Sequence, residues 1–188
     1  MTIINPSTGE PIRELAEDST ASLGNKFQLL ASAQPAWAGR TVGERVGILR
    51  RFSSLLEEQI EPLANILSTE VGKPLQQSRN EIRGACTRIK WINDNAARYL
   101  DDEVMANANG MEERICYEAL GVICNISAWN YPYLVGVNVF VPALVAGNAV
   151  MYKPSEYATL TGLEIGRLLV QAGVPEHVFQ VAIGGRQT

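Results

Sequence analysis

The chain has 188 residues, 46% of them hydrophobic, and a formal net charge of −4 at pH 7. This composition indicates a packed globular protein, and the acidic balance without a block of Lys and Arg argues against nucleic acid or an anionic membrane as its main partner. The longest apolar region, residues 134–150, is interrupted by Asn138, Pro142, Gly147 and Asn148, so no membrane span is predicted.

The first part of the chain predicts helices. The pattern favours a helix over residues 18–34, with Ser19 or Thr20 as its cap. Thr41 and Glu44 have the spacing of a capping box, in which a hydroxyl and a carboxylate satisfy free backbone donors at the start of a helix. Apolar residues at helical spacing then mark one buried face. They are Ile48, Leu49, Phe52, Leu55, Leu56 and Ile60.

Two more helices are predicted before residue 101. Pro62 suits the first position of one helix, and Gly72 followed by Pro74 suits its end. An apolar stripe on a long helix follows: Ile82, Ala85, Cys86, Ile89, Ile92, Ala96 and Leu100. Such a stripe could contact a partner protein, but ordinary core packing is the interpretation that we prefer.

The second part of the chain alternates strands with helices. Residues 101–110 are polar and are expected to form a loop, and residues 114–118 a strand. Further strands are expected at 120–126, 149–152 and 178–183, with helices within 133–146 and at 160–172. Thr161 and Glu164 have the spacing of a second capping box, and Gly173 suits the end of that helix.

These elements predict the fold class. Successive strand–helix–strand units should be right-handed and give a parallel sheet. We therefore expect an α/β fold in which N-terminal helices precede the first half of a doubly wound parallel, Rossmann-like sheet. That sheet would be incomplete within the chain.

Cysteine and histidine usage limits the possible chemistry. Three cysteines without metal-ligand spacing, and no charged segment before an apolar stretch at the start, indicate a cytoplasmic protein. Cys86 lies in a helix stripe and Cys124 in an apolar strand, so both are interpreted as buried packing residues, and Cys116 is no better placed for catalysis. His177 is the only histidine and is expected at the surface, so no metal site is predicted.

Polar residues follow two of the predicted strands. Ligands of open parallel sheets bind at the carboxyl ends of the strands, where Trp129, Asn130, Lys153 and Glu156 would lie. The Lys153 ammonium can donate to ribose hydroxyls or a phosphate, and the Glu156 carboxylate can accept from ribose hydroxyls. The alternative for residues 153–156 is a solvated turn.

The same segments resemble a known family. Residues 126–132, Ile-Ser-Ala-Trp-Asn-Tyr-Pro, and residues 153–156, Lys-Pro-Ser-Glu, resemble two motifs of the aldehyde dehydrogenase superfamily at a matching interval. Residues 5–10, 35–37 and 70–74 resemble further landmarks of that family. The resemblance covers essentially the whole chain but only the first part of a family member.

The resemblance implies a nicotinamide cofactor. Lys153 and Glu156 would bind the adenosine ribose, and Ile126, Ser127 and Trp129 would line the nicotinamide end. A carboxylate at the ribose should repel the extra phosphate of NADP, so NAD is the expected cofactor.

Two further positions could contact the cofactor, but each has an alternative interpretation. Ser155 could hydrogen-bond a phosphate, which leaves NADP open. Gly185 could allow close backbone approach to the cofactor, with a simple turn as the alternative.

The resemblance gives Asn130 the single catalytic role within this chain. The matching asparagine helps to hold the thiohemiacetal oxygen that forms when a cysteine attacks the aldehyde, and an amide donor stabilises such an oxyanion without proton transfer. The alternative is that Asn130 only caps the following helix. Ala128, Tyr131 and Tyr133 depart from the commoner family pattern, which leaves the substrate class open.

The resemblance also implies an organisation and a function. Residues 1–110 would form the helical part of a cofactor domain, 111–119 a strand toward an oligomerisation sheet, and 120–188 the first βαβαβ part of the dinucleotide-binding domain. The nucleophile, the general base and the catalytic domain would lie beyond residue 188.

The full-length protein would be a homo-oligomeric, NAD(P)-dependent enzyme that oxidises a small aldehyde to a carboxylic acid, and this chain alone would be inactive. The alternative is a shortened, non-enzymatic binding or interaction module.

Overall fold

The computed structural model describes residues 1–108 and 110–185. The chain begins with a β-hairpin. Strands β1 (Thr2–Ile4) and β2 (Pro11–Glu14) pair antiparallel, and Ile3 is buried. The hairpin rests on the end of helix α3 (Ile60–Val71), where a Cβ added to Gly72 would lie 2.8 Å from Pro6 Cγ. A glycine is therefore required at that contact.

Local capping signals start the first two helices. Helix α1 (Thr20–Ala38) begins at Ser19, one of the two predicted caps, whose hydroxyl accepts from the Ser22 backbone N–H. Helix α2 (Val42–Glu58) begins with the predicted capping box: Glu44 N donates to Thr41 Oγ1 at 3.2 Å, and Thr41 N donates to Glu44 Oε2 at 2.7 Å. Both starts are confirmed.

Helices α3 and α4 (Leu75–Leu100) differ from prediction in one detail. Pro62 was expected at the first position of α3 but is the third residue, because α3 follows α2 after a single residue, Gln59. Gly72 ends α3 with φ +76°, the left-handed conformation expected of a terminating glycine. The apolar stripe of α4 is buried or partly buried in the core, so its interpretation as core packing is confirmed.

The parallel sheet is the centre of the fold. Strands β5 (Val122–Ile126), β6 (Ala149–Lys153) and β7 (Phe179–Val181) pair in the order β5-β6-β7, all parallel. Helix α5 (Pro132–Val145) connects β5 to β6, and α6 (Thr159–Ala172) connects β6 to β7. The predicted α/β class and strand–helix alternation are confirmed.

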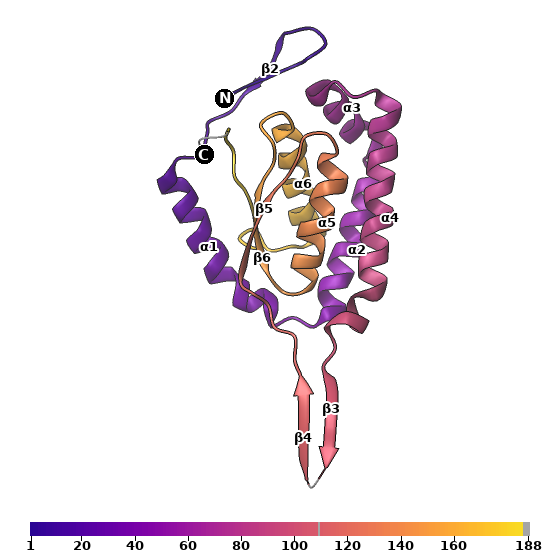
Figure 1. Cartoon of the computed structure of the whole chain (residues 1–188). Coiled ribbons are helices and arrows are strands. Elements are labelled where there is room, and N and C mark those ends of the chain that lie inside the picture. The colour runs from indigo at the N-terminus through magenta and orange to yellow at the C-terminus, as the bar shows by residue number, and fades with distance from the viewer. Residues whose placement is uncertain (109, 186–188) are drawn as a thin grey trace.

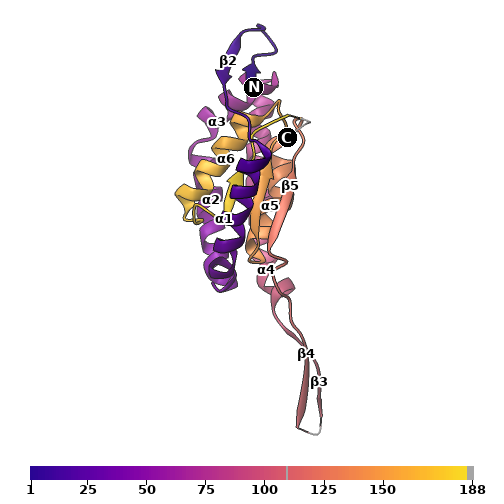
Figure 2. The ribbon, with the colours of Figure 1, turned by 90° about the vertical axis from the view of Figure 1, so that its left-hand side faces the viewer.

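The elements form layers around this sheet. Helix α1 lies on one face, and α5 and α6 cover the other, with α2, α3 and α4 packed outside them (Figures 1 and 2). Aromatic rings fill the space between the sheet and the helices. Phe140 lies 5.7 Å from Tyr152, 5.4 Å from Phe179 and 6.1 Å from Phe52, each pair edge to face.

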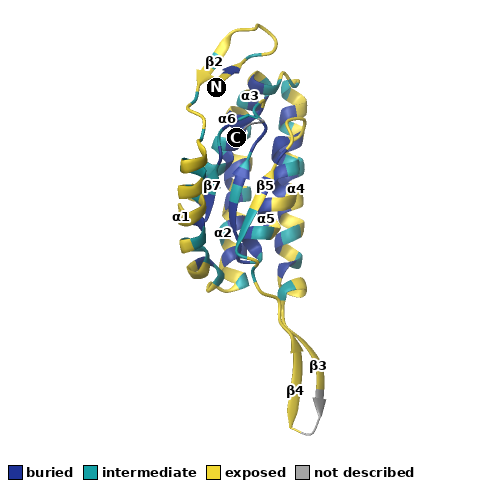
Figure 3. Cartoon of the chain, turned by 60° about the vertical axis from the view of Figure 1, so that its left-hand side comes forward, coloured by how far each residue is buried: buried dark blue, intermediate teal, exposed yellow. Residues whose placement is uncertain are grey.

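A long hairpin projects away from this layered body. Strands β3 (Glu103–Ala108) and β4 (Met111–Ile115) pair antiparallel and extend into solvent, with β4 exposed throughout (Figures 1 and 3). The predicted loop at 101–110 is therefore wrong, and the strand predicted at 114–118 begins earlier and ends at Ile115. Cross-strand hydrogen bonds hold such a ribbon without a buried face, so its sequence shows no clear alternation.

No helix in the described part of the chain is long and apolar enough to cross a bilayer.

Candidate functional site

A hollow of about 620 Å³ lies at the carboxyl ends of the parallel strands. All seven residues predicted to contact a cofactor line it: Ile126, Ser127, Trp129, Lys153, Ser155, Glu156 and Gly185. The fold thus brings together residues that are up to 59 positions apart in the sequence. Its other lining residues were not predicted: Leu23, Cys124, Ala128, Met151, Tyr157 and Ala182.

Strand register explains this convergence. Ile126 pairs with Lys153, and Ser127 N donates to Lys153 O at 2.9 Å, so β5 and β6 end at the same level. Ile126 is 76% exposed, whereas Ser127 is buried. The side chain of Ile126 therefore presents apolar surface at the hollow.

The segment after β6 carries the charges of the hollow. Lys153 Nζ donates to Pro154 O at 2.9 Å and lies 3.9 Å from Glu156 Oε2. Ser155 Oγ donates to Glu156 Oε2 at 3.2 Å and accepts from Tyr157 N at 3.3 Å. The Lys153 side chain is only 18% exposed, more enclosed than in a freely solvated turn.

Asn130 is displaced from the charged part of the site. It is exposed in the turn before α5 and is not among the residues that line the hollow. The cap position of α5 is Tyr131, which makes no side-chain capping bond, so the alternative role of Asn130 as a helix cap is not observed. The backbone carbonyl of Asn130 accepts from Lys73 Nζ at 2.6 Å.

Glutamates from distant helices cap the two helices beside the sheet edge. Glu81 Oε1 accepts from Tyr133 N at 2.8 Å at the start of α5. Glu70 accepts from Leu160 N at 2.6 Å and from Thr161 N at 2.9 Å at the start of α6. Burial raises the pKa of Glu70 and Glu81 above their ordinary values despite these hydrogen bonds.

This arrangement corrects the predicted second capping box. Thr161 lies inside α6 and donates its hydroxyl to Glu70 at 3.0 Å, and Glu164 instead accepts from Arg167. A helix N-terminus attracts anions, and here buried carboxylates already occupy both sites. Lys153 is therefore the cation that the hollow itself offers to a phosphate or a hydroxyl. The signal that sequence reasoning missed is a glutamate within each apolar helix face.

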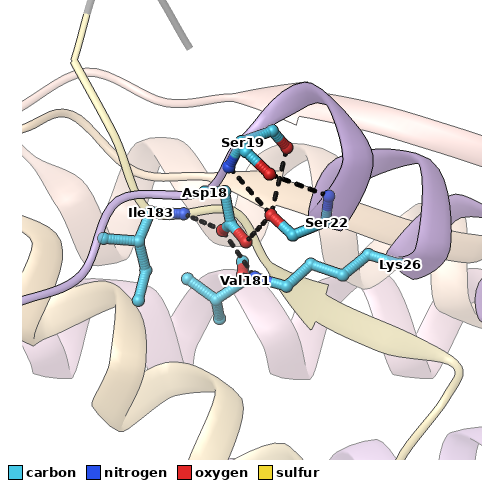
Figure 4. A network of polar contacts seen from close by, with 6 residues as sticks. All are labelled: Asp18, Ser19, Ser22, Lys26, Val181 and Ile183. Carbon is cyan, nitrogen blue, oxygen red and sulfur yellow. Dashed lines mark hydrogen bonds and ion pairs between the residues drawn. The ribbon is translucent and has the colours of Figure 1, made fainter.

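A polar network lies next in sequence to two lining residues of the hollow, Leu23 and Ala182 (Figure 4). Asp18 Oδ2 accepts from Ile183 N at 2.7 Å and from Lys26 Nζ at 2.5 Å, and Lys26 also donates to Val181 O at 2.7 Å. Burial opposes ionisation of Asp18, but hydrogen bonds from Lys26, Ile183 and Ser22 outweigh it and lower its pKa. The network joins the start of α1 to the segment after β7.

The cysteines and the histidine supply no evident catalytic group. Burial raises the pKa of Cys86 to about 11, so its thiol stays protonated at neutral pH. Cys124 was predicted to be buried but is exposed, because its side chain lines the hollow instead of packing in the core. Cys116 and His177 are exposed. Within residues 1–108 and 110–185, no three His, Cys, Asp or Glu side chains group as metal ligands.

Two tyrosines that depart from the family pattern have separate environments. Tyr133 is fully buried, and burial raises its pKa well above the ordinary value, so it is a neutral core residue. Tyr131 is exposed, with Lys73 Nζ 4.0 Å from its ring centroid. Neither lines the hollow.

Comparisons with known proteins agree on one family. The model of the aldehyde dehydrogenase family matches residues 1–188. The 3,6-anhydro-α-L-galactose dehydrogenase of Streptomyces coelicolor is 33% identical over 187 residues, which cover 99% of this chain and 38% of that protein.

Solved structures show the same relationship. The NADP-dependent glyceraldehyde-3-phosphate dehydrogenase of Bacillus halodurans, complexed with NADP, has a TM-score of 0.93 and 30% identity, covering 100% of this chain and 40% of that one. The NAD-dependent benzaldehyde dehydrogenase of Corynebacterium glutamicum has a TM-score of 0.92 and 31% identity, covering 100% and 42%. The chain thus spans about two fifths of the length of the relatives that it matches.

Proposed function

The chain belongs to the aldehyde dehydrogenase family, and from this premise we propose that it provides the nicotinamide-cofactor site of an enzyme that oxidises an aldehyde to a carboxylic acid. The observation that carries the proposal is the convergence of all seven predicted contact residues on one hollow. Its volume of about 620 Å³ lies within the range of roughly 300–1,000 Å³ that is typical of ligand sites.

The residues of the hollow fit a dinucleotide. Lys153 and Glu156 offer a donor and an acceptor for ribose hydroxyls, and their partial burial strengthens both interactions. Gly185 has no atom within 4 Å of where a Cβ would stand, so its backbone is open to approach. Trp129 and Ile126 supply exposed apolar surface for a nicotinamide ring. A bound nicotinamide would accept the hydride from the aldehyde carbon.

NAD remains the preferred proposal for the cofactor. At the adenosine ribose the Glu156 carboxylate would repel the extra phosphate of NADP, and the Ser155 hydroxyl already donates to that carboxylate. Lys153 nearby would partly offset the repulsion. One of the similar structures above is described as NADP-dependent and another as NAD-dependent, so family membership alone does not choose between them.

Asn130 is proposed as the donor to the oxyanion that forms when a cysteine attacks the aldehyde. We place that cysteine and the general base outside this chain, since burial raises the pKa of Cys86, Cys116 does not line the hollow, and Cys124 lies within strand β5. The β3–β4 hairpin is the proposed contact with other copies in a homo-oligomer. We further propose a small-molecule aldehyde as the substrate and the cytoplasm as the location.

A second candidate is a nucleotide-binding module without oxidative activity. The observation that favours it is that the residues proposed to bind the adenosine ribose, Lys153 and Glu156, meet Gly185 in one hollow of this chain. Both candidates require cofactor binding, and only the first requires aldehyde oxidation.

Two measurements separate the candidates. Calorimetric titration of the purified chain with NAD and NADP tests the site, and absence of binding would contradict both. Oxidation is tested in a chimera in which this chain replaces the matching part of the Streptomyces coelicolor relative. Reduction of the cofactor by the chimera in the presence of an aldehyde supports the enzyme, and binding without reduction favours the module.

A further inference from the structure

Lys73 lies in a tightly held turn between α3 and α4. It follows Gly72, which has φ +76°, and its carbonyl accepts from Ser68 Oγ at 2.5 Å. Its side chain is only 9% exposed, which is unusual for a lysine. A buried ammonium is stable only when it is paired or hydrogen-bonded, so its partners indicate its structural role.

The ammonium of Lys73 has three partners, two of them in the turn that contains Asn130. Nζ donates to Asn130 O at 2.6 Å and lies 4.0 Å from the ring centroid of Tyr131. It also forms an ion pair with the carboxylate of Glu81. Two hydrogen bonds and a cation–π contact therefore fix it in one place.

Glu81 extends this contact into helix α5. Its side chain is fully buried, and its second oxygen accepts from Tyr133 N at 2.8 Å and Leu134 N at 3.4 Å. The Lys73–Glu81 pair thus holds the segment from Asn130 to Leu134 at both sides of the helix start. Removing either partner would leave a buried charge without its counter-ion.

We propose that the Lys73–Glu81 pair positions the side-chain amide of Asn130 for the oxyanion role, a proposal that rests on the proposed function. Asn130 is exposed, and its amide makes no hydrogen bond within the part of the chain that the structure describes. The orientation of the Asn130 amide is therefore set through the Asn130 backbone, whose carbonyl accepts a hydrogen bond from Lys73. Lys73 touches no reacting atom and is a positioning residue.

Hydrogen–deuterium exchange of the purified chain tests the positioning step. Lys73→Met keeps the unbranched side chain up to the position of Cε and removes the charged Nζ, and Lys90→Met is the matched control because Lys90 is 75% exposed. We expect faster exchange at residues 130–135 in Lys73→Met, unchanged exchange in α6, and no change in the control. Faster exchange throughout the chain would mean general destabilisation and would overturn the proposal, as would unchanged exchange at 130–135.

Two further variants keep the test decisive if Lys73→Met does not fold. Lys73→Arg retains a cationic donor and should restore slow exchange at residues 130–135. Glu81→Gln retains an acceptor for Tyr133 N but loses the charge, and should loosen the same residues. Wild-type exchange in a folded Glu81→Gln variant would contradict the positioning role.

The chimera described above supplies a kinetic readout. Because misplacement of a catalytic group by about 1 Å can cost about a hundredfold in rate, Lys73→Met should lower kcat by about ten- to a hundredfold and leave the KM for the cofactor unchanged. A fall in cofactor affinity with kcat preserved would overturn the proposal. An inactive wild-type chimera would count against the proposed function, whereas the exchange result would still decide whether Lys73 holds the Asn130 turn.

Discussion

Glu70 accepts hydrogen bonds from both the backbone N–H and the hydroxyl of Thr161, although 91 residues separate them. Glu70 also accepts from Leu160 N, so one buried carboxylate from α3 provides the N-terminal cap that α6 lacks locally. The relationship joins the N-terminal helices to the parallel sheet and fixes the helix that follows the Lys153–Glu156 turn.

The first prediction concerns this cap. Glu70→Ala should lower the free energy of unfolding by about 2–4 kcal/mol, because two backbone donors and a hydroxyl lose their buried acceptor. Glu58→Ala removes an exposed carboxylate at the end of α2 and is the control, with an expected change within about 0.5 kcal/mol. Chemical denaturation measures both, and equal effects would show that the Glu70 bonds add no stability.

The second prediction concerns how the free energy of unfolding depends on Asp18 at low pH. The pKa of Asp18 is lowered by its hydrogen bonds, so its contribution is present above its unfolded pKa, near 3.8, and is lost as pH falls through the lower folded value. Asp18→Asn should cost about 1.5–3 kcal/mol near neutral pH, and the difference from wild type should narrow below pH 3.8.

Thermal melts across a pH series check this prediction. Glu176→Gln, at an exposed position, is the control and should follow the wild-type profile. A constant difference between Asp18→Asn and wild type from pH 7 to pH 2 would assign the effect to packing.

The third prediction concerns cofactor choice. Glu156→Ala should weaken NAD binding and narrow the preference against NADP, because it removes a ribose acceptor and a repulsive charge together. Lys153→Ala should weaken the binding of both NAD and NADP, and the control Lys90→Ala should change the binding of neither. If titrations show that no variant changes the affinity for either nucleotide, residues 153–156 form only a solvated turn.

The fourth prediction concerns activity. The purified chain should form no reduced cofactor with a panel of aldehydes, since burial raises the pKa of Cys86 to about 11 and a hydrogen bond with Asp102 raises the pKa of Cys116. Absorbance at the wavelength of the reduced nicotinamide measures this. Turnover by wild type that disappears in Cys116→Ser or Cys124→Ser would refute the expectation and identify the nucleophile.

The fifth prediction concerns association. Strand β5 is an edge of the parallel sheet, and Leu120 before it is 87% exposed. Unpaired strand edges with exposed apolar residues recruit other chains, so the purified chain should self-associate at micromolar concentration. Sedimentation measures the association, which Leu120→Lys should reduce. A wild-type monomer with a cooperative melt would show a self-sufficient domain and would favour the binding module.

Local sequence determined the starts of α1 and α2, the ends of two helices and the place of the candidate site. Thr41 and Glu44 form their capping box, and Gly72 and Gly173 end helices, because each signal acts on neighbouring backbone groups. Strand ends could also be predicted, since apolar runs stop where backbone leaves the sheet. In a parallel sheet such ends meet at one edge, which is why seven residues chosen from sequence line the same hollow.

Only the tertiary structure decided the features that depend on residues far apart in the sequence. The α5 and α6 caps come from glutamates 52 and 91 residues away, so the capped segments themselves carry no local signal for their caps. The β3–β4 ribbon is held by pairing with its own neighbour, so it lacks the alternation that burial imposes. Cys124 is exposed because its side chain faces the hollow, which only the folded arrangement of strands and helices creates. Local propensity acts over a few residues, whereas caps, edges and rims depend on which segments meet after the chain folds.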